Sequence, residues 1–165
     1  MKIAIISDIH DSWGNLQEAL NIISDQKCDR LFVAGDLISP PGLRIIKEAQ
    51  IQTELILGNN EGALVVFTRL ADSIDSINFH EYTFEEEVSG KQIFMHHLPR
   101  PVELAAKSGE FDVCIHGHTH FFRNESFDDA LLLNPGSLIG NKEPAGFVIL
   151  DLDSLEVERL DLAKQ

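Results

Sequence analysis

The sequence is poor in basic residues, and this scarcity narrows the range of partners. It holds 13 Lys and Arg against 27 Asp and Glu, so its formal net charge is −14 at pH 7. A surface that negative repels nucleic acid and anionic membranes at long range. The sequence has no Lys/Arg cluster that could form a basic groove, which argues against a nuclease. We therefore expect neither a nucleic acid nor a membrane as partner, although acidic residues gathered in one place can still hold cations.

Cysteine and long apolar runs are equally scarce. The two cysteines, Cys28 and Cys114, stand beside apolar neighbours and outside any C-x-x-C spacing. This favours core thiols in a reducing compartment over disulfide or metal roles. Apolar runs stay below the roughly 18 residues of a membrane helix, and the opening run meets Asp8 too early for a signal-peptide core. We expect a cytoplasmic protein.

The rest of the composition is that of a globular chain. Hydrophobic residues make up 44% and charged residues 24% of the 165 positions, which is ordinary for a folded domain. This length is enough to bury a substantial core, and it is short for two domains. We predict a single domain over residues 1–165.

Short apolar runs alternate with helical patterns in the first sixty residues. The pattern predicts strands over residues 2–6, 31–34 and 54–57 and helices over residues 15–26 and 43–49. Strands and helices that alternate in this way are typical of parallel βαβ units.

The second half has a different pattern. Ser89-Gly90 separates two strand-like runs, residues 81–88 and 91–95, and so predicts a hairpin. A helix over residues 101–107 and strands over residues 112–115, 130–133, 147–152 and 155–160 should follow. Sheets in both halves with helices outside predict a layered α/β sandwich.

Hard polar side chains follow the predicted strands, at the edge where open α/β sheets bind their ligands. They are Asp8, His10, Asp36, Asn59, His96, His118 and His120. Any one of the Asp or Asn residues could simply cap the next helix. Seven oxygen and nitrogen donors together, without a thiolate, instead predict a site for two ions such as Mn²⁺, Fe²⁺ or Zn²⁺.

These residues lie in ordered motifs that resemble those of the calcineurin-like metallophosphoesterases. The motifs are Asp8-Ile9-His10, Gly35-Asp36, Gly58-Asn59-Asn60-Glu61, a His96 that follows a strand, and Gly117-His118-Thr119-His120. A further segment, Asn134-Pro135-Gly136-Ser137, resembles the small phosphodiesterases of the YfcE and archaeal type. The resemblance covers nearly the whole chain, and the α/β fold that it implies is a four-layer α/β/β/α sandwich of two mixed sheets flanked by helices.

The resemblance implies a role for each motif residue. Asp8, His10 and His120 would bind one divalent ion, Asn59, His96 and His118 the other, and Asp36 would bridge them. The implied catalytic residues are Asp36, Asn59 and His96. The two ions, with Mn²⁺ preferred and Fe, Ni or Zn as alternatives, would activate a hydroxide that attacks a small phosphate ester, a diester in preference to a monoester. We also expect Asp8 and His10 to project from one side of an extended segment.

Two positions depart from the family pattern. Asn60 stands where larger phosphatases of the family have a histidine, and an amide cannot donate a proton as a general acid, so Asn60 is expected only to hydrogen-bond phosphate. Met95-His96-His97-Leu98 stands where the small subfamily tends to show Thr-His-Gly-His. We take His96 as the ligand because it is the first residue beyond the predicted strand. His97 becomes a loop residue that could contact phosphate, and an exchange of the two remains open.

The alternative function is a non-catalytic metal-binding or protein-interaction module of the same fold, resembling a subunit of the retromer. The complete set of seven ligand positions favours the enzyme over this module. The sequence leaves a homo-oligomer open.

Overall fold

The computed structural model describes residues 1–163. The elements in chain order are β1 (Lys2–Ile6), α1 (Trp13–Asp25), β2 (Arg30–Ala34), α2 (Pro41–Glu48), β3 (Gln52–Ile56), α3 (Leu64–Asp72), β4 (Ile77–Phe79), β5 (Thr83–Val88), β6 (Lys91–His96), α4 (Pro99–Ser108), β7 (Val113–Ile115), β8 (Phe122–Phe127), β9 (Ala130–Pro135), β10 (Gly146–Asp151) and β11 (Glu156–Asp161). No helix within residues 1–163 is long and apolar enough to cross a membrane.

Both sheets mix parallel and antiparallel strands. The first has the order β11-β10-β1-β2-β3-β4, with β1 to β4 parallel and β10 antiparallel to β1. The second has the order β5-β6-β7-β9-β8, where the parallel strands β6, β7 and β9 lie between antiparallel edge strands. The βαβ order predicted for the first half is therefore confirmed, because each parallel pair among β1, β2 and β3 is connected by a helix.

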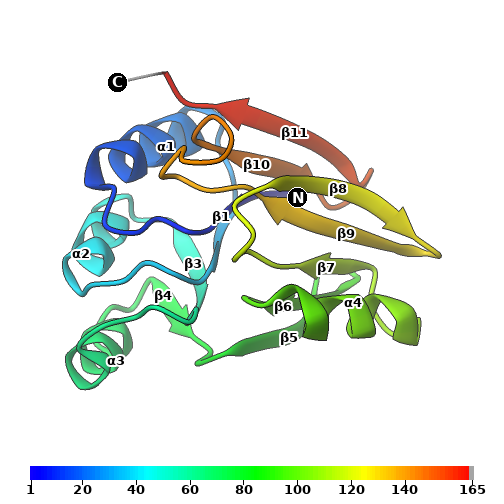
Figure 1. Cartoon of the computed structure of the whole chain (residues 1–165), viewed down its shortest axis with the longest axis horizontal. Helices are drawn as coiled ribbons and strands as arrows, with labels where there is room; N and C mark the ends of the chain where they lie inside the picture. Colours follow the sequence, from blue (N-terminus) through cyan, green and yellow to red (C-terminus); the bar gives the residue numbers. More distant parts are fainter. Residues whose placement is uncertain (164–165) are drawn as a thin grey trace.

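Three apolar cores separate four layers. Along β1, Ala4 and Ile6 pack against the layer of α1 to α3, whereas Ile3 and Ile5 pack against the second sheet. Burial on both faces explains why this strand is an unbroken apolar run. A third core, which includes Val102, joins α4 to the outer face of the second sheet. Figure 1 shows the helices α1 to α3 on one side and α4 on the other. The predicted α/β/β/α sandwich is confirmed.

The sequence analysis missed α3, β4 and β8. Helix α3 begins after Ala63, which has a left-handed backbone and makes no side-chain cap. Its first residues, Leu64, Val65 and Val66, are apolar but exposed. The helix therefore starts without a polar cap and without the apolar periodicity on which helix recognition depends. Strand β8 is a mostly polar edge strand, and β4 has only three residues, so neither carries a strong strand signal.

Candidate metal centre

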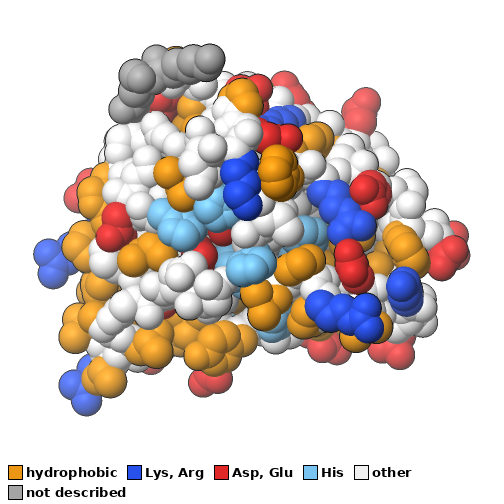
Figure 2. Space-filling view, viewed as in Figure 1, with side chains coloured by type: hydrophobic (Ala, Val, Ile, Leu, Met, Phe, Trp, Pro, Cys, Tyr) orange, Lys and Arg blue, Asp and Glu red, His pale blue; other side chains and the backbone are white. Residues whose placement is uncertain are grey.

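The loops after β1, β2, β3, β6 and β7 meet at one edge of the two sheets. Figure 2 shows histidine side chains gathered near the middle of this face of the molecule. Beneath them, the carboxylates of Asp8 and Asp36 are 0% and 1% exposed. Two buried acids side by side need compensating charge or hydrogen bonds, because an unpaired buried charge is costly.

The backbone at the site lies largely in the left-handed region. Positive φ angles of 53°, 44°, 56°, 68° and 62° occur at Asp8, His10, Asp36, His118 and His120. Such angles are uncommon for residues other than glycine, and strain of this kind clusters at functional sites. The expectation that Asp8 and His10 lie on an extended segment is therefore wrong. A tight turn brings the two side chains to the same side.

The Asp8 carboxylate is held by one oxygen and left free at the other. Its Oδ2 accepts hydrogen bonds from the Ser7 hydroxyl at 2.8 Å and from the His118 backbone N–H at 2.9 Å. Its Oδ1 is buried and has no hydrogen-bond partner in the described part of the chain. A buried, ionisable oxygen without a partner is unusual in a native protein. A cation would satisfy it.

The Asp36 carboxylate accepts hydrogen bonds at both oxygens. Its Oδ1 accepts the backbone N–H groups of Asn59 at 2.9 Å and of Asn60 at 3.0 Å. Its Oδ2 lies 3.2 Å from His10 Nε2 and 3.4 Å from His97 Nε2, and accepts the Asn60 side-chain amide at 2.7 Å. Burial acts to raise the pKa of Asp36, but His97 and the Asn60 donors outweigh it and hold this pKa below its usual range. The carboxylate is therefore ionised.

The imidazoles of His10, His97 and His120 direct Nε2 toward Asp36 Oδ2 or Asp8 Oδ1. His97 Nδ1 lies 2.7 Å from the Ala34 carbonyl oxygen. Because a carbonyl only accepts, Nδ1 must carry the hydrogen, which leaves the Nε2 lone pair free. His120 Nδ1 is anchored in the same way on Asn141 Oδ1 at 2.9 Å, and its Nε2 lies 3.2 Å from Asp8 Oδ1. Within the described residues, the buried Nε2 atoms of His10 and His97 are unpaired, as is that of His116, which belongs to neither group of candidate metal ligands.

The donor atoms fall into two groups that share Asp8. One group is Asp8, His10 and His120, and the other is Asp8, Asp36 and His97; within each group the ligand atoms lie within 4.8 Å of one another. Two further donors lie beside them: the His118 ring centroid is 5.4 Å from that of His97, and Asn59 Oδ1 is 2.7 Å from His118 Nδ1. Carboxylate and imidazole donors with unpaired buried atoms fit divalent transition-metal ions.

The structure places His97, and not His96, in this cluster. Strand β6 runs one residue further than predicted, so that His96 still pairs with Thr83. Side chains alternate along a strand: Ile93 and Met95 point between the sheets, and His97, which is 2% exposed, continues that face. His96 points the other way, where its Nδ1 accepts the Leu98 backbone N–H at 3.0 Å and burial lowers the pKa of its ring. The expected placement of His96 is thus wrong, because the strand end was placed one residue too early.

The two residues expected to contact substrate also lie differently from expectation. His97 is a buried member of the donor cluster instead of a loop residue near phosphate. The Asn60 backbone and side chain both donate to Asp36. Asn60 therefore positions this carboxylate.

Several supporting residues had no role in the sequence analysis. Glu61 bridges two site loops, since its carboxylate accepts the backbone N–H groups of Leu37 at 3.2 Å and Gly58 at 2.7 Å. Burial raises the pKa of Glu61. Asn134 holds the loop between His116 and His120, because its amide donates to the Gly117 carbonyl at 2.8 Å. Their presence in two of the recognised motifs was the only sequence signal for them.

Close packing explains two glycines of the motifs. A Cβ on Gly58 would overlap Asp36 Oδ1, and a Cβ on Gly117 would overlap the Ser7 hydroxyl. Only glycine therefore allows the loops to approach the carboxylates so closely.

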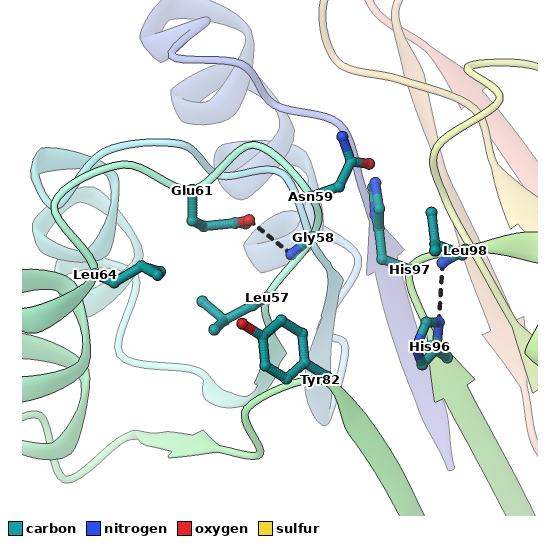
Figure 3. A pocket seen from close by; sticks show the side chains of 9 residues that line it. All are labelled: Leu57, Gly58, Asn59, Glu61, Leu64, Tyr82, His96, His97 and Leu98. Atoms are coloured by element: carbon teal, nitrogen blue, oxygen red, sulfur yellow. Dashed lines mark hydrogen bonds between the residues drawn. The ribbon is translucent and has the colours of Figure 1, made fainter.

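A pocket of about 320 Å³ opens beside the donor cluster. It is lined by Leu57, Gly58, Asn59, Glu61, Leu64, Tyr82, His96, His97 and Leu98. Figure 3 shows Leu64 at one side, His96 and Leu98 at the other, and Leu57 and Tyr82 between them. Asn59 and His97 belong to both the pocket wall and the donor set, so the pocket and the cluster are continuous.

Comparison with known proteins gives a consistent result. Residues 1–155 match the family described as the calcineurin-like phosphoesterase superfamily domain. The phosphodiesterase MJ0936 of Methanocaldococcus jannaschii is 34% identical over 145 residues, which span 85% of this chain and 86% of that protein. The phosphodiesterase YfcE of Escherichia coli is 27% identical over an alignment of 172 positions, gaps included, which covers 98% of this chain and 93% of that protein.

Solved structures share the fold. A structure described as a novel archaeal phosphodiesterase superposes with a TM-score of 0.92 at 29% identity and covers 98% of this chain and 100% of its own. Vps29 of Entamoeba histolytica complexed with zinc has a TM-score of 0.66 at 18% identity, with coverage of 98% and 99%. At that identity the second likeness concerns the fold alone.

Proposed function

We propose that this chain, which belongs to the calcineurin-like phosphoesterase superfamily, hydrolyses phosphodiesters with the help of two divalent cations. The observation that carries the proposal is the convergence of buried, unpartnered atoms at the sheet edge. Asp8 Oδ1 and the Nε2 atoms of His10 and His97 face a common space and, among residues 1–163, have no hydrogen-bond partner. The phosphodiesterases among its relatives support the choice of reaction.

The donors divide between two cations. Asp8, His10 and His120 would hold one ion, and His97, Asn59 and His118 the other, with Asp36 shared between them. Mn²⁺ is the preferred ion, and Fe, Ni or Zn also suit these ligands. Bound there, such ions supply Lewis-acid stabilisation of the phosphoryl charge and lower the pKa of water to near neutrality.

The protein contributes positioning before any substrate arrives. Backbone N–H groups fix one oxygen each of Asp8 and Asp36, so the other oxygen of each faces the common space. The Ala34 carbonyl fixes the tautomer of His97. Because these groups already have their geometry, little reorganisation is needed during the reaction.

The leaving group receives no proton from Asn60. Its side-chain amide donates to Asp36 Oδ2 at 2.7 Å, and an amide has no acidic proton to transfer. Alcohols that leave easily are therefore the preferred leaving groups. We propose a small phosphate ester as the natural substrate and a cytoplasmic enzyme that acts as one domain.

Metal analysis combined with paired substrates tests this function. Purified protein is stripped with EDTA, reloaded with Mn²⁺ and assayed with bis(p-nitrophenyl) phosphate and p-nitrophenyl phosphate. We expect two ions per chain, no turnover after stripping and faster hydrolysis of the diester. A protein that binds the ions and hydrolyses neither ester would support the interaction module instead. A faster monoesterase reaction would contradict the diester preference.

A further inference from the structure

The pocket beside the donor cluster has an apolar wall that the chemistry at the cations does not require. Leu57, Leu64, Tyr82 and Leu98 supply this wall. Leu64, Tyr82 and Leu98 are 44%, 53% and 38% exposed. Exposed apolar side chains grouped around one concavity mark a binding site more often than scattered ones do. Tyr82 adds an aromatic ring, which contacts ligand rings with little loss of conformational freedom.

Charge in the same pocket is unfavourable for a second anionic group. Of the nine described residues that line it, none is a lysine or an arginine, and Glu61 is one of them. The Glu61 carboxylate occupies the backbone N–H groups of Leu37 and Gly58, so these two donors are not available to an anion in the pocket. The net charge of −14 adds to this repulsion.

The pocket is also directly connected to the place where phosphate would lie. Asn59 and His97 form part of its wall and part of the donor set. A volume of about 320 Å³ lies at the small end of ligand pockets. It has room for a single ring or a compact alkyl group.

We propose that this pocket binds an uncharged apolar or aromatic ester group of the substrate, and that Leu64 and Tyr82 select for it. The proposal rests on the proposed function, because it places the phosphate at the donor cluster. It narrows the substrate class to phosphate esters that carry at least one neutral ring or compact apolar substituent. Esters whose second group bears a further phosphate or carboxylate are excluded.

Two phosphonates test the proposal by binding alone. Phenylphosphonate and methylphosphonate share the same anionic head and differ only in the group that would enter the pocket. Their affinities are measured by isothermal titration calorimetry on the Mn²⁺-loaded protein. We expect phenylphosphonate to bind about 10-fold more tightly, an effect of the size that apolar pockets give.

Variants at neighbouring positions of α3 provide a matched control. Leu64→Asp places a charge on the pocket wall, whereas Val65→Asp places the same charge one residue further along, outside the lining set. Both positions are exposed and lie in the first turn of the helix, where an acid is tolerated. Leu64→Asp should remove most of the preference for phenylphosphonate, Tyr82→Ala should reduce it, and Val65→Asp should preserve it.

The outcomes separate this proposal from the proposed function. Equal affinity for the two phosphonates in the unaltered protein, or an equal effect of both α3 variants, would overturn the pocket assignment while leaving phosphodiester hydrolysis intact. Failure to bind either phosphonate, together with absence of diester hydrolysis, would overturn the proposed function, and the pocket assignment would fall with it.

Discussion

The two sheets contribute to the donor cluster in different ways. The first sheet supplies both carboxylates, which are buried and fixed by hydrogen bonds, as Asp36 is by the N–H groups of Asn59 and Asn60 at one oxygen and by the Asn60 side-chain amide at the other. The second sheet supplies imidazoles, each anchored at Nδ1 by a single partner, and His118 is exposed. Negative charge is thus built rigidly into one sheet. The other sheet closes over it with neutral ligands.

This division has a physical reason. A buried carboxylate pays a large desolvation cost, so each of its oxygens needs a donor or a cation. An imidazole costs less to leave exposed and needs only one contact to set its tautomer. The carboxylates should therefore dominate ion binding, whereas the histidines should determine how closely and how selectively the ions are held.

The largest effect is expected for Asp36→Asn. Its Oδ2 lies within 3.4 Å of Nε2 atoms from both sheets, so loss of its charge weakens both ion positions at once. We expect fewer bound ions per chain and a fall in turnover on the order of 10³-fold, since charge stabilisation by metal ions amounts to several kcal/mol. Metal analysis measures the number of bound ions, and the rate of diester hydrolysis measures the fall in turnover.

Asp11→Asn is the matched control for this variant. Asp11 lies in the same loop as His10, but its carboxylate contacts Ser39 and it belongs to neither donor group. Its removal should leave ion content and turnover near those of the unaltered protein. Equal behaviour of Asp36→Asn and Asp11→Asn would show that the carboxylate is not shared between the ions.

The adjacent histidines give the next largest contrast. His97→Ala removes a buried Nε2 of the donor cluster, and His96→Ala removes a side chain from the pocket wall. We expect His97→Ala to lower ion content and to reduce turnover about 10²-fold or more, as misplacement of reacting groups does. His96→Ala should keep its ions and change mainly KM. Loss of metal only in His96→Ala would return the ligand role to the other face of β6.

This pair also shows how far the sequence could lead. Apolar runs and turn residues predicted a layered α/β sandwich, and the resemblance carried by the ordered motifs implied the two mixed sheets and the four layers. Neither determined the choice between His96 and His97, because it depends on whether β6 ends at Met95 or one residue later. A shift of one residue reverses which face a side chain occupies. The left-handed backbone at Asp8 and His10 could not be predicted either, because glycine is the only residue type that favours such angles and neither position is a glycine.

A smaller effect concerns pH and added metal. The nearby Asp8 carboxylate raises the pKa of His10, and although burial acts to lower the pKa of His97, its contacts with Asp36, Asp8 and the Ala34 carbonyl raise it overall. Groups with a raised folded pKa stabilise the metal-free protein below the unfolded pKa of about 6.5, and this stability is lost as pH rises through the folded pKa. Protons and cations compete for the same nitrogen atoms.

Added Mn²⁺ should therefore raise Tm more at about pH 8 than at about pH 6. At a free concentration about 100 times Kd, binding contributes about 2.7 kcal/mol, which is roughly 5–10 °C for a chain of this length. Differential scanning fluorimetry with EDTA or Mn²⁺ measures the difference. A shift that is constant across this range would mean that neither histidine gives up a proton to the ion.

The smallest effect is expected at Glu61, which touches neither donor group but ties together the loops that carry Asp36 and Asn59. In Glu61→Gln one carboxylate oxygen becomes an NH₂ group that faces a backbone N–H, so one of the two hydrogen bonds is lost and two donors confront each other. Residues that orient ligands typically account for about 10–100-fold in metal affinity or activity, and we expect the low end because the other bond survives. Titration of stripped protein with Mn²⁺, together with diester turnover, measures both quantities.

Glu86→Gln on the exposed part of β5 provides the same chemical change without the contact. If Glu61→Gln and Glu86→Gln bind Mn²⁺ equally well, the loops hold their positions without this bridge, and the rigidity of the carboxylate sheet must come from the backbone N–H groups alone.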